Sequence, residues 1–298
     1  MRHTWLFLLA SAAALTARAG DLPAINSPAT TDCFAGKFVW ADLLTSDQAA
    51  AATFYTQLFG WTAATVDRSS PERGPLSFIV LSSGGRPVAG IALGPKRLRS
   101  ETRGHWLGFV SVQDVTQTLA LAVGNGGHVL SPEKVIPQRG TQAIFTDPEG
   151  AMLGIVHSSS GDPGEYRPEV GEFTWAEVFA RDTGQAALYY RSVLGYSISL
   201  DSRSDRVGSY LFASGGFARA SLAPLPTDRP GAHPAWLLFV RVAGLDDAVA
   251  RTTALGGRVL VSPKDISGGS RIAVIADPVG AAIGLVERQE AAPEAAQK

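Results

Sequence analysis

The sequence predicts an α+β protein made of two tandem copies of one module, and two observations carry this prediction. First, the stretch FVWADLLTSD at 38–47 recurs as FTWAEVFARD at 173–182. Second, the similarity continues when the chain is shifted against itself by 135 residues, and then by 130. Self-similarity over so long a period indicates a duplicated module, here residues 36–158 and 171–288. The aligned pairs include Trp40 with Trp175, Tyr55 with Tyr190, Gly60 with Gly195, Trp106 with Trp236, and Asp147 with Asp277.

Each copy is expected to begin with a strand followed by an amphipathic helix. Asp47 and Asp182 stand where this helix would start, and Gly60 and Gly195 stand where it would end, as the residue preferences of helix termini predict. Apolar residues fall on one face of each helix at helical spacing. They are Ala51, Phe54, Tyr55, Leu58 and Phe59 in the first copy, and Ala186, Tyr189, Tyr190, Val193 and Leu194 in the second.

The rest of each copy is expected to hold more strands, a second helix and a last group of strands. The tetrads DPEG at 147–150 and DPVG at 277–280 suit type I turns. Asp is favoured at the first position of such a turn, Pro sets φ at the second, and Gly is favoured at the last. Each tetrad should therefore link two strands.

The N-terminus predicts export. Arg2 precedes an apolar run from Trp5 to Leu15, and Ala17-Arg18-Ala19 closes it, which is the pattern of a secretory signal peptide cleaved near Ala19. The run is shorter than the roughly 18 residues that span a bilayer. We therefore expect residues 1–19 to be removed and the mature protein to be secreted or periplasmic, without a membrane partner. An uncleaved N-terminal anchor is the alternative.

Three further segments lie outside the two copies. Residues 20–35 are expected to form an N-terminal linker, and residues 159–170 a linker between the modules, since they are rich in Ser, Gly and Pro. Residues 289–298 are expected to form a disordered tail, because they offer nothing to bury.

Composition narrows the class of partner. The chain has 26 basic and 27 acidic residues and a net charge of -1, so no basic field favours nucleic acid or an anionic membrane. Cys33 is the single cysteine, which excludes an intramolecular disulfide. Nor does any GxSxG or Ser-His-Asp spacing favour a hydrolase. A small-molecule partner remains as the expectation, and the oligomeric state stays open.

Several motifs together resemble those of a known superfamily. They are the strand ending in Asp, the helix ends FYTQLFGW at 54–61 and YYRSVLGY at 189–196, the Gly-Gly pairs at 126–127 and 256–257, and the late DPxG turns. These motifs are similar to those of the vicinal oxygen chelate superfamily, which includes glyoxalase I, extradiol dioxygenases and bleomycin-resistance proteins. The resemblance implies tandem βαβββ-type modules whose curved, partly open mixed sheets surround a pocket. In the family this pocket usually holds a divalent metal bound by His and Glu.

The resemblance also implies where that metal would be bound. The matching positions carry Trp40 and Trp175, Leu107 and Leu237, Gly154 and Gly284, and the neighbourhood of Val80 and Leu211. These side chains offer no oxygen or imidazole nitrogen to a metal ion. We therefore expect no metal and no other cofactor, and chemistry that needs a Lewis acid should fail. A relocated metal site is the alternative, because strand alternation places His105 on the same face as Leu107.

The sharpest candidates for function are two carboxylates. Strand alternation places Asp42 on the same face as Trp40, and Glu177 on the same face as Trp175. Two acids in an aromatic, partly dry pocket could act as a general acid or base, or could bind a polar group of a ligand. The alternative is structural: both Trp side chains would fill the core, and both acids would pair with arginines such as Arg181 or Arg241.

These observations favour a small-molecule binder over other classes. We expect Trp40, Trp175, Leu107, Leu237 and His105 to line the ligand site, and Asp42 and Glu177 to be the candidate catalytic residues. The favoured activity is binding of a partly apolar molecule, with proton transfer by a carboxylate as the metal-independent chemistry. The alternatives are a metal-dependent lyase or dioxygenase with relocated ligands, a binder that sequesters a drug, and a structural or protein-binding role.

Overall fold

The computed structural model describes residues 22–67, 77–94, 104–202, 204–228, 231–267 and 269–288. The expected signal peptide and the expected C-terminal tail lie outside these ranges. No helix within them is long and apolar enough to cross a membrane.

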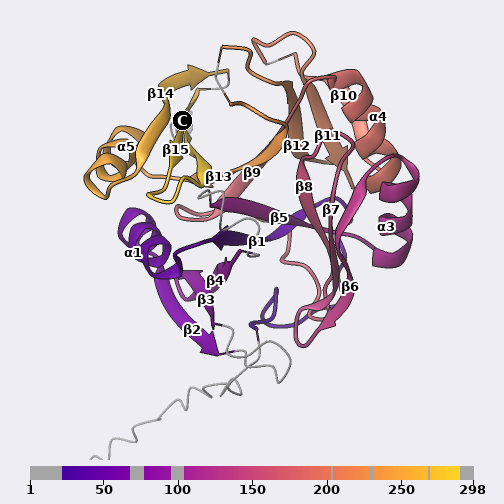
Figure 1. The fold of residues 1–298 in the computed structure, drawn as a ribbon, viewed down its shortest axis with the longest axis horizontal. Coiled ribbons are helices and arrows are strands. Elements are labelled where there is room, and N and C mark those ends of the chain that lie inside the picture. The colour runs from indigo at the N-terminus through magenta and orange to yellow at the C-terminus, as the bar shows by residue number, and fades with distance from the viewer. Residues whose placement is uncertain are drawn as a thin grey trace, which may run out of the picture.

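In its described residues, the first module is one eight-stranded sheet with two helices (Figure 1). The strand order in the sheet is β2-β3-β4-β1-β5-β8-β7-β6. Its elements are β1 (Phe38–Thr45), α1 (Gln48–Phe59), β2 (Thr62–Asp67), β3 (Ser77–Ser83), β4 (Arg86–Leu93), β5 (His105–Ser111), α3 (Val115–Gly124), β6 (His128–Ile136), β7 (Gly140–Thr146) and β8 (Met152–His157).

The second module repeats this arrangement in the order β10-β11-β12-β9-β13-β16-β15-β14. Its elements are β9 (Phe173–Ala180), α4 (Thr183–Leu194), β10 (Ser197–Leu200), β11 (Tyr210–Ser214), β12 (Phe217–Pro224), β13 (Ala235–Arg241), α5 (Leu245–Ala254), β14 (Arg258–Ile266), β15 (Ser270–Ala276) and β16 (Ala282–Arg288).

Both sheets are mixed and open, which confirms the predicted α+β class with two tandem modules. Within the first module β1 runs parallel to β4, while β5 runs parallel to β8 and antiparallel to β1. Each module therefore holds two βαβββ units, joined side by side through their first strands. The sheet does not close, because β2 and β6 form its two free edges.

The helix ends lie where the sequence predicts them. The Asp47 side chain accepts a hydrogen bond from the backbone N–H of Ala50, and Asp182 does the same for Gln185, so each satisfies an unpaired N–H of the first turn. Gly60 and Gly195 end α1 and α4 with φ values of 71° and 69°. A residue without Cβ adopts this left-handed conformation at little cost.

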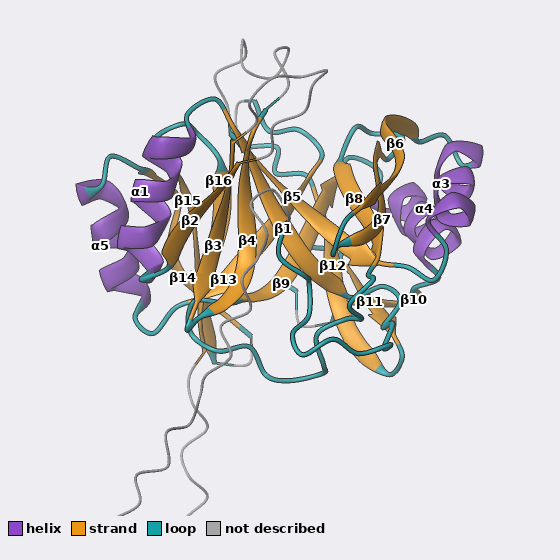
Figure 2. Ribbon diagram, turned by 90° about the horizontal axis from the view of Figure 1, so that it is seen from below, coloured by secondary structure: helices purple, strands orange, loops and turns teal. Residues whose placement is uncertain are grey.

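The helices of the two modules pack against each other in pairs. Figure 2 shows α1 beside α5 on one flank and α3 beside α4 on the other, with both sheets between them. One continuous hydrophobic core runs under these helices through both modules. Each sheet consequently has one face covered by helices and one that is not, and we call the latter the open face.

Two buried hydrogen-bond chains cross between the modules. Trp236 Nε1 donates to Tyr190 Oη at 3.0 Å, and Tyr190 Oη donates to Asp147 Oδ2 of the first module at 2.8 Å. In the related set of hydrogen bonds, Trp106 Nε1 donates to Tyr55 Oη at 2.9 Å, and Tyr55 Oη donates to Asp277 Oδ2 of the second module at 3.2 Å. The predicted turn residues thus also join the modules, since the other oxygen of Asp147 caps its own turn at Glu149 N and Ala151 N.

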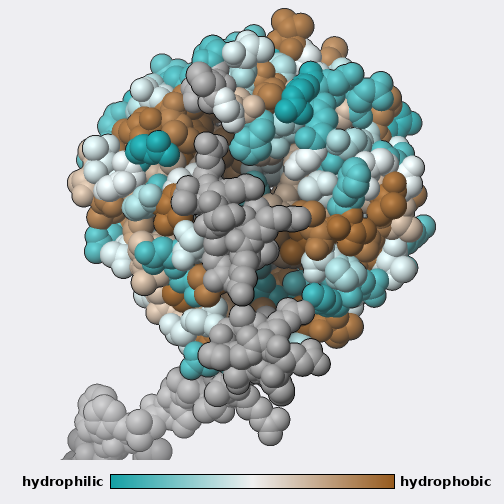
Figure 3. All heavy atoms as spheres, viewed as in Figure 1, coloured by the Kyte–Doolittle hydropathy of each residue, from teal (hydrophilic) through white to brown (hydrophobic). Residues whose placement is uncertain are grey.

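Exposed apolar residues recur at equivalent edges of the two modules. In Figure 3 an apolar area is visible on the right, where Figure 1 places β6, β7 and α3. Val129 and Leu130 of β6 are exposed, and so are Val259 and Leu260 at the matching positions of β14. Because both copies share this feature, we attribute it to the module and not to a specialised site.

Candidate functional site

The open face of each sheet carries the residues singled out from the sequence. In β9 the side chains of Ala176 and Val178 belong to the helix-covered core, so Trp175 and Glu177 point to the open face. The same alternation places Trp40 and Asp42 on the open face of the first module. The register aligns Asp42 with Leu107 and Glu177 with Leu237 across neighbouring strands.

In the first module an arginine covers the Trp40–Asp42 pair. Trp40 Nε1 donates to Asp42 Oδ1 at 2.7 Å. The Arg139 guanidinium lies over the Trp40 ring, 3.8 Å from its centroid, with Nη1 3.9 Å from Asp42 Oδ1. Only 2% of the Arg139 side chain is exposed. The Asp42 carboxylate is thereby committed to contacts within the protein.

The N-terminal segment closes this face further. Ile25 packs with Trp40 and Leu107 in one buried cluster, and Leu22 packs with Phe78 in another. The backbone carbonyl of Pro23 accepts from Arg139 Nε at 3.3 Å. The sequence predicted residues 20–35 only as a linker, and nothing in their composition indicated that they lie against the first open face.

The second open face has a different polar cluster. Trp175 Nε1 donates to Ser221 Oγ at 2.9 Å, and Ser221 Oγ lies 3.3 Å from Glu177 Oε1. Arg206 Nη2 donates to the same Oε1 at 2.8 Å. Burial raises the pKa of Glu177, although the charge and hydrogen bond of Arg206 oppose this rise.

The arginines beside the two acids are therefore not the ones suggested by the sequence. Arg139 and Arg206 take these places, whereas Arg181 lies beside Glu149 and Arg241 donates to the carbonyl of Pro168. Arg139 has no counterpart in the second module, because Gly269 occupies the matching position between β14 and β15.

The second open face is the more accessible of the two. Trp40 is 5% exposed and Leu107 1%. Leu237 is 8% exposed, and Trp175 is only partly buried. Among the described residues, the core clusters include no segment over Leu237 that corresponds to residues 22–25.

In the described structure, His105 makes no hydrogen bond to Asp42 or Glu177. It pairs in register with Leu44, two residues from Leu107 along β5, so it shares the first open face. Its Nε2 is buried without a hydrogen-bond partner among the described residues. Burial, followed by the positive charge of His233, lowers the pKa of His105 to about 4, so its ring is neutral near pH 7.

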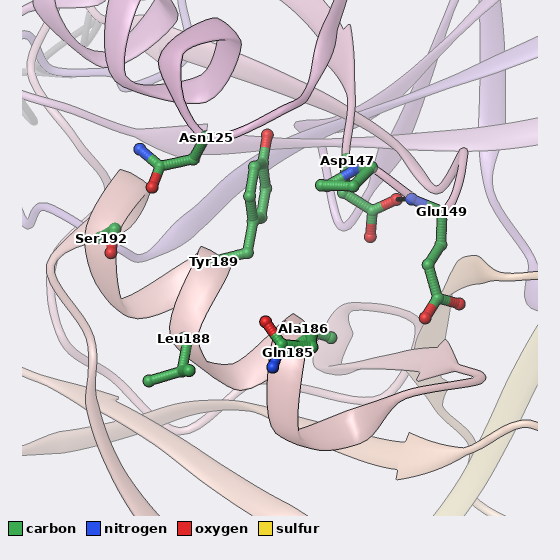
Figure 4. A pocket seen from close by; sticks show the side chains of 9 residues that line it. Asn125, Asp147, Glu149, Gln185, Ala186, Leu188, Tyr189 and Ser192 are labelled. Carbon is green, nitrogen blue, oxygen red and sulfur yellow. Dashed lines mark hydrogen bonds between the residues drawn. The ribbon is translucent and has the colours of Figure 1, made fainter.

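A separate cavity of about 390 Å³ lies between the modules. Figure 4 shows Tyr189 of α4 standing between Asn125 and Asp147, with Glu149 at the far side. The acids here are already engaged: Asp147 in its turn and with Tyr190, and Glu149 with the backbone N–H groups at the start of α4. We therefore place the candidate ligand site on the second open face.

The sequence matches the family model of the Glyoxalase/Bleomycin resistance protein/Dioxygenase superfamily over residues 37–155 and 172–285. The chain belongs to this superfamily. Relatives of this chain include CFP32 of Mycobacterium tuberculosis, which bears the name of a glyoxylase and is 30% identical over 249 residues, or 83% of this chain and 93% of that protein. The anthracycline biosynthesis protein DauV of a Streptomyces species is 30% identical over 272 residues, or 88% of this chain and 96% of DauV.

Solved structures of a glyoxalase and a dioxygenase share the fold. The Mn(II)-bound glyoxalase from Novosphingobium aromaticivorans aligns with a TM-score of 0.57 at 14% identity, covering 87% of this chain and 84% of that one. A single-residue variant of homoprotocatechuate 2,3-dioxygenase from B. fuscum aligns with a TM-score of 0.59 at 14% identity, covering 91% of this chain and 76% of that one.

The positions at which the resemblance implies a metal carry Trp, Leu and Gly, whose side chains offer no ligand atom to a divalent ion. Besides Trp, Leu and Gly, the register adds Gly90 beside Asp42 and Ser221 beside Glu177 on the strands next to β1 and β9. A Cβ on Gly90 would come within 2.5 Å of Asp42 Oδ1, so a larger ligand residue has no room there. Across the described ranges, no three or more His, Cys, Asp or Glu side chains are grouped to hold a metal.

Proposed function

We propose that this protein binds a small, partly apolar molecule on the open face of the second module and does so without a metal ion. The observation that carries the proposal is the difference between the two copies. The chain's own Arg139 and N-terminal segment lie on the first open face, whereas the matching surface around Trp175 is more accessible.

The chemistry of this surface suits such a ligand. Trp175 and Leu237 supply an apolar wall backed by the buried Phe239, and Glu177 with Ser221 supplies polar groups at one end. Apolar walls with a few well-placed polar groups are typical of small-molecule sites. Export through the N-terminal signal peptide is part of the proposal, so the ligand would be met outside the cytoplasm.

Proton transfer by Glu177 is a second candidate activity. Both hydrogen bonds that described side chains make to this carboxylate reach Oε1, which leaves Oε2 to accept a proton from a ligand. The raised pKa of Glu177 favours this role, because a stronger base holds the abstracted proton better. Returning the proton to another atom of the ligand would complete an isomerisation, with no oxidant or metal required.

The test uses the neutral fluorescent probe N-phenyl-1-naphthylamine, titrated into the mature chain. We expect saturable binding at one site, weakened about tenfold or more in Trp175→Ala, because a large aromatic contact area is lost. Leu200→Ala serves as the control, since Leu200 is 70% exposed on β10. Elemental analysis of protein purified without chelators is expected to give far less than one metal ion per chain.

Two results would refute the proposal. One is probe binding that Trp175→Ala and Leu200→Ala change equally, which would place the site elsewhere. The other is a stoichiometric transition metal whose removal by chelators abolishes probe binding.

A further inference from the structure

The second open face continues past Trp175 to a pair of arginines. In β13, Leu237, Phe239 and Arg241 alternate with core residues and so share the open face. In β16, Ile283 and Leu285 belong to the core, which places Arg288 on the open face as well. Arg241 pairs in register with Val286, two residues before Arg288. The two guanidinium groups therefore extend from neighbouring strands at the same end of the face.

No described acid neutralises Arg288. Its one hydrogen bond goes from Nη2 to Thr174 Oγ1 at 3.0 Å, and it forms no ion pair within the described ranges. Burial lowers the pKa of Arg288, and the charges of Arg167 and Arg241 lower it further. The carboxylate of Glu172, a little further along the chain from Arg167, is bound by Arg86 and by the N–H of Glu169. A partly buried guanidinium group without a counter-ion favours an anion.

The first module lacks this feature. The offset of 130 residues places Ser111 opposite Arg241 and Ser158 opposite Arg288. Ser111 Oγ lies 3.4 Å from Cys33 Sγ, and Ser158 Oγ donates to the carbonyl of Gly161 at 2.8 Å. In the first module these positions thus contact the chain's own segments through neutral side chains. In the second they carry the positively charged Arg241, which donates to the carbonyl of Pro168, and Arg288.

We infer that the ligand of the second module is a small organic anion with an aromatic body, such as an aromatic carboxylate. This inference rests on the proposed function and specifies the ligand class of the same site. Arg288 and Arg241 bind the anionic group, Trp175 packs against the body, and Glu177 meets a polar group at the opposite end. The four residue-to-residue steps from Leu237 to Arg241 span about 13 Å of strand, enough for a two- or three-ring molecule.

The experiment compares two probes that share one scaffold. The anionic probe is 1-anilinonaphthalene-8-sulfonate, and the neutral one is N-phenyl-1-naphthylamine, which lacks the sulfonate. We expect the anion to bind the mature chain more tightly. Arg288→Gln should weaken anion binding about tenfold, as expected for the loss of one charge-assisted hydrogen bond, and should change binding of the neutral probe less than about twofold.

Controls separate the site from general electrostatics. Arg191→Gln removes an exposed positive charge on α4, on the helix side of the sheet, and should leave both probes unaffected. Arg288→Lys keeps the charge and should retain most of the anion affinity, which also shows whether loss in Arg288→Gln reflects misfolding. Raising the salt concentration should weaken binding of the anion only.

The outcomes distinguish this inference from the proposed function. If the neutral probe binds at Trp175 but Arg288→Gln and Arg191→Gln weaken the anion equally, the anion site is refuted and the apolar site stands. If neither probe binds, the proposed function fails and the anion site fails with it.

Discussion

The hydrogen-bond chain through Tyr190 should contribute strongly to stability, and Tyr190→Phe tests this directly. The substitution removes one hydroxyl and keeps the ring, which packs edge-on against Trp236 with centroids 5.2 Å apart. It leaves the Trp236 N–H and Asp147 Oδ2 without their shared partner. All three residues are at most 3% exposed, so water cannot readily replace the hydroxyl.

The size of the expected loss of stability follows from these two groups that lose their hydrogen-bond partner. A buried neutral donor without a partner costs about 1–3 kcal/mol, and a lost hydrogen bond to a charged group costs about 1.5–3 kcal/mol. Because Asp147 keeps its bonds to Glu149 N and Ala151 N, we expect the lower half of the sum. Tyr190→Phe should therefore lower the free energy of unfolding by about 2.5–4 kcal/mol.

Urea denaturation followed by tryptophan fluorescence and circular dichroism measures this loss. Tyr210→Phe is the matched control, since Tyr210 is partly buried in the same core without a hydrogen bond from its hydroxyl in the described structure, and it should change stability by less than about 0.5 kcal/mol. A loss in Tyr190→Phe no larger than in this control would refute the reasoning. Tyr55→Phe should behave like Tyr190→Phe, and the two losses should add, because Tyr55 belongs to α1 and Tyr190 to α4, which lie on opposite flanks of the molecule (Figure 2).

Three further predictions concern protons and processing. His105→Leu should remove a pH dependence of stability. Relative to this variant, the wild type should lose about 3 kcal/mol of stability as pH falls from 6.5 to about 4, because the pKa of His105 is lower in the folded than in the unfolded protein. A difference in stability between the two proteins that stays constant across this pH range in urea melts would contradict the prediction. Glu177→Gln should act in the opposite direction, with the wild type losing stability relative to the variant as pH rises above 4.5, because burial raises the folded pKa; melts from pH 4 to 7 that run in parallel would exclude this. N-terminal sequencing of the exported protein should begin at Gly20, and recovery of an intact Met1 from the periplasm or medium would refute the signal peptide.

The fold was predictable because its signals are local and occur twice. Asp47 and Gly60 mark helix ends by capping chemistry alone, and the same pattern returns at Asp182 and Gly195. The face shared by Trp40 and Asp42 follows from strand alternation, and the 2.7 Å hydrogen bond between them shows this placement. Such inferences need only the periodicity of a strand or helix.

The residues that contact Asp42, Glu177 and Arg139 on the open faces were not predictable in the same way, because these contacts join distant parts of the chain. Pro23 meets Arg139 across 116 residues, and Arg206 reaches Glu177 across 29 from a loop between β10 and β11. One signal was available: aligning the copies places Arg139 opposite Gly269. A large charged residue opposite glycine at an otherwise duplicated turn indicates that the two copies differ in what lies beside them.

The difference between the two open faces bears on the function of the duplicated modules. If both open faces bound the same ligand, equivalent positions should carry similar chemistry. Instead, the first module carries Ser111 and Ser158 where the second carries Arg241 and Arg288, and it buries an internal guanidinium over Trp40. Under the proposed function, a face already occupied by its own chain contributes packing and not a site, because displacing Arg139 would remove the ion pair of the largely buried Asp42 carboxylate at a cost of several kcal/mol. Under the proposed function, the first module would serve as a folded support. Its Asp147 turn is bonded to Tyr190 of α4, and α4 covers the sheet that carries Trp175 and Glu177. Ligand selectivity should accordingly change with substitutions on the second open face and not with those on the first.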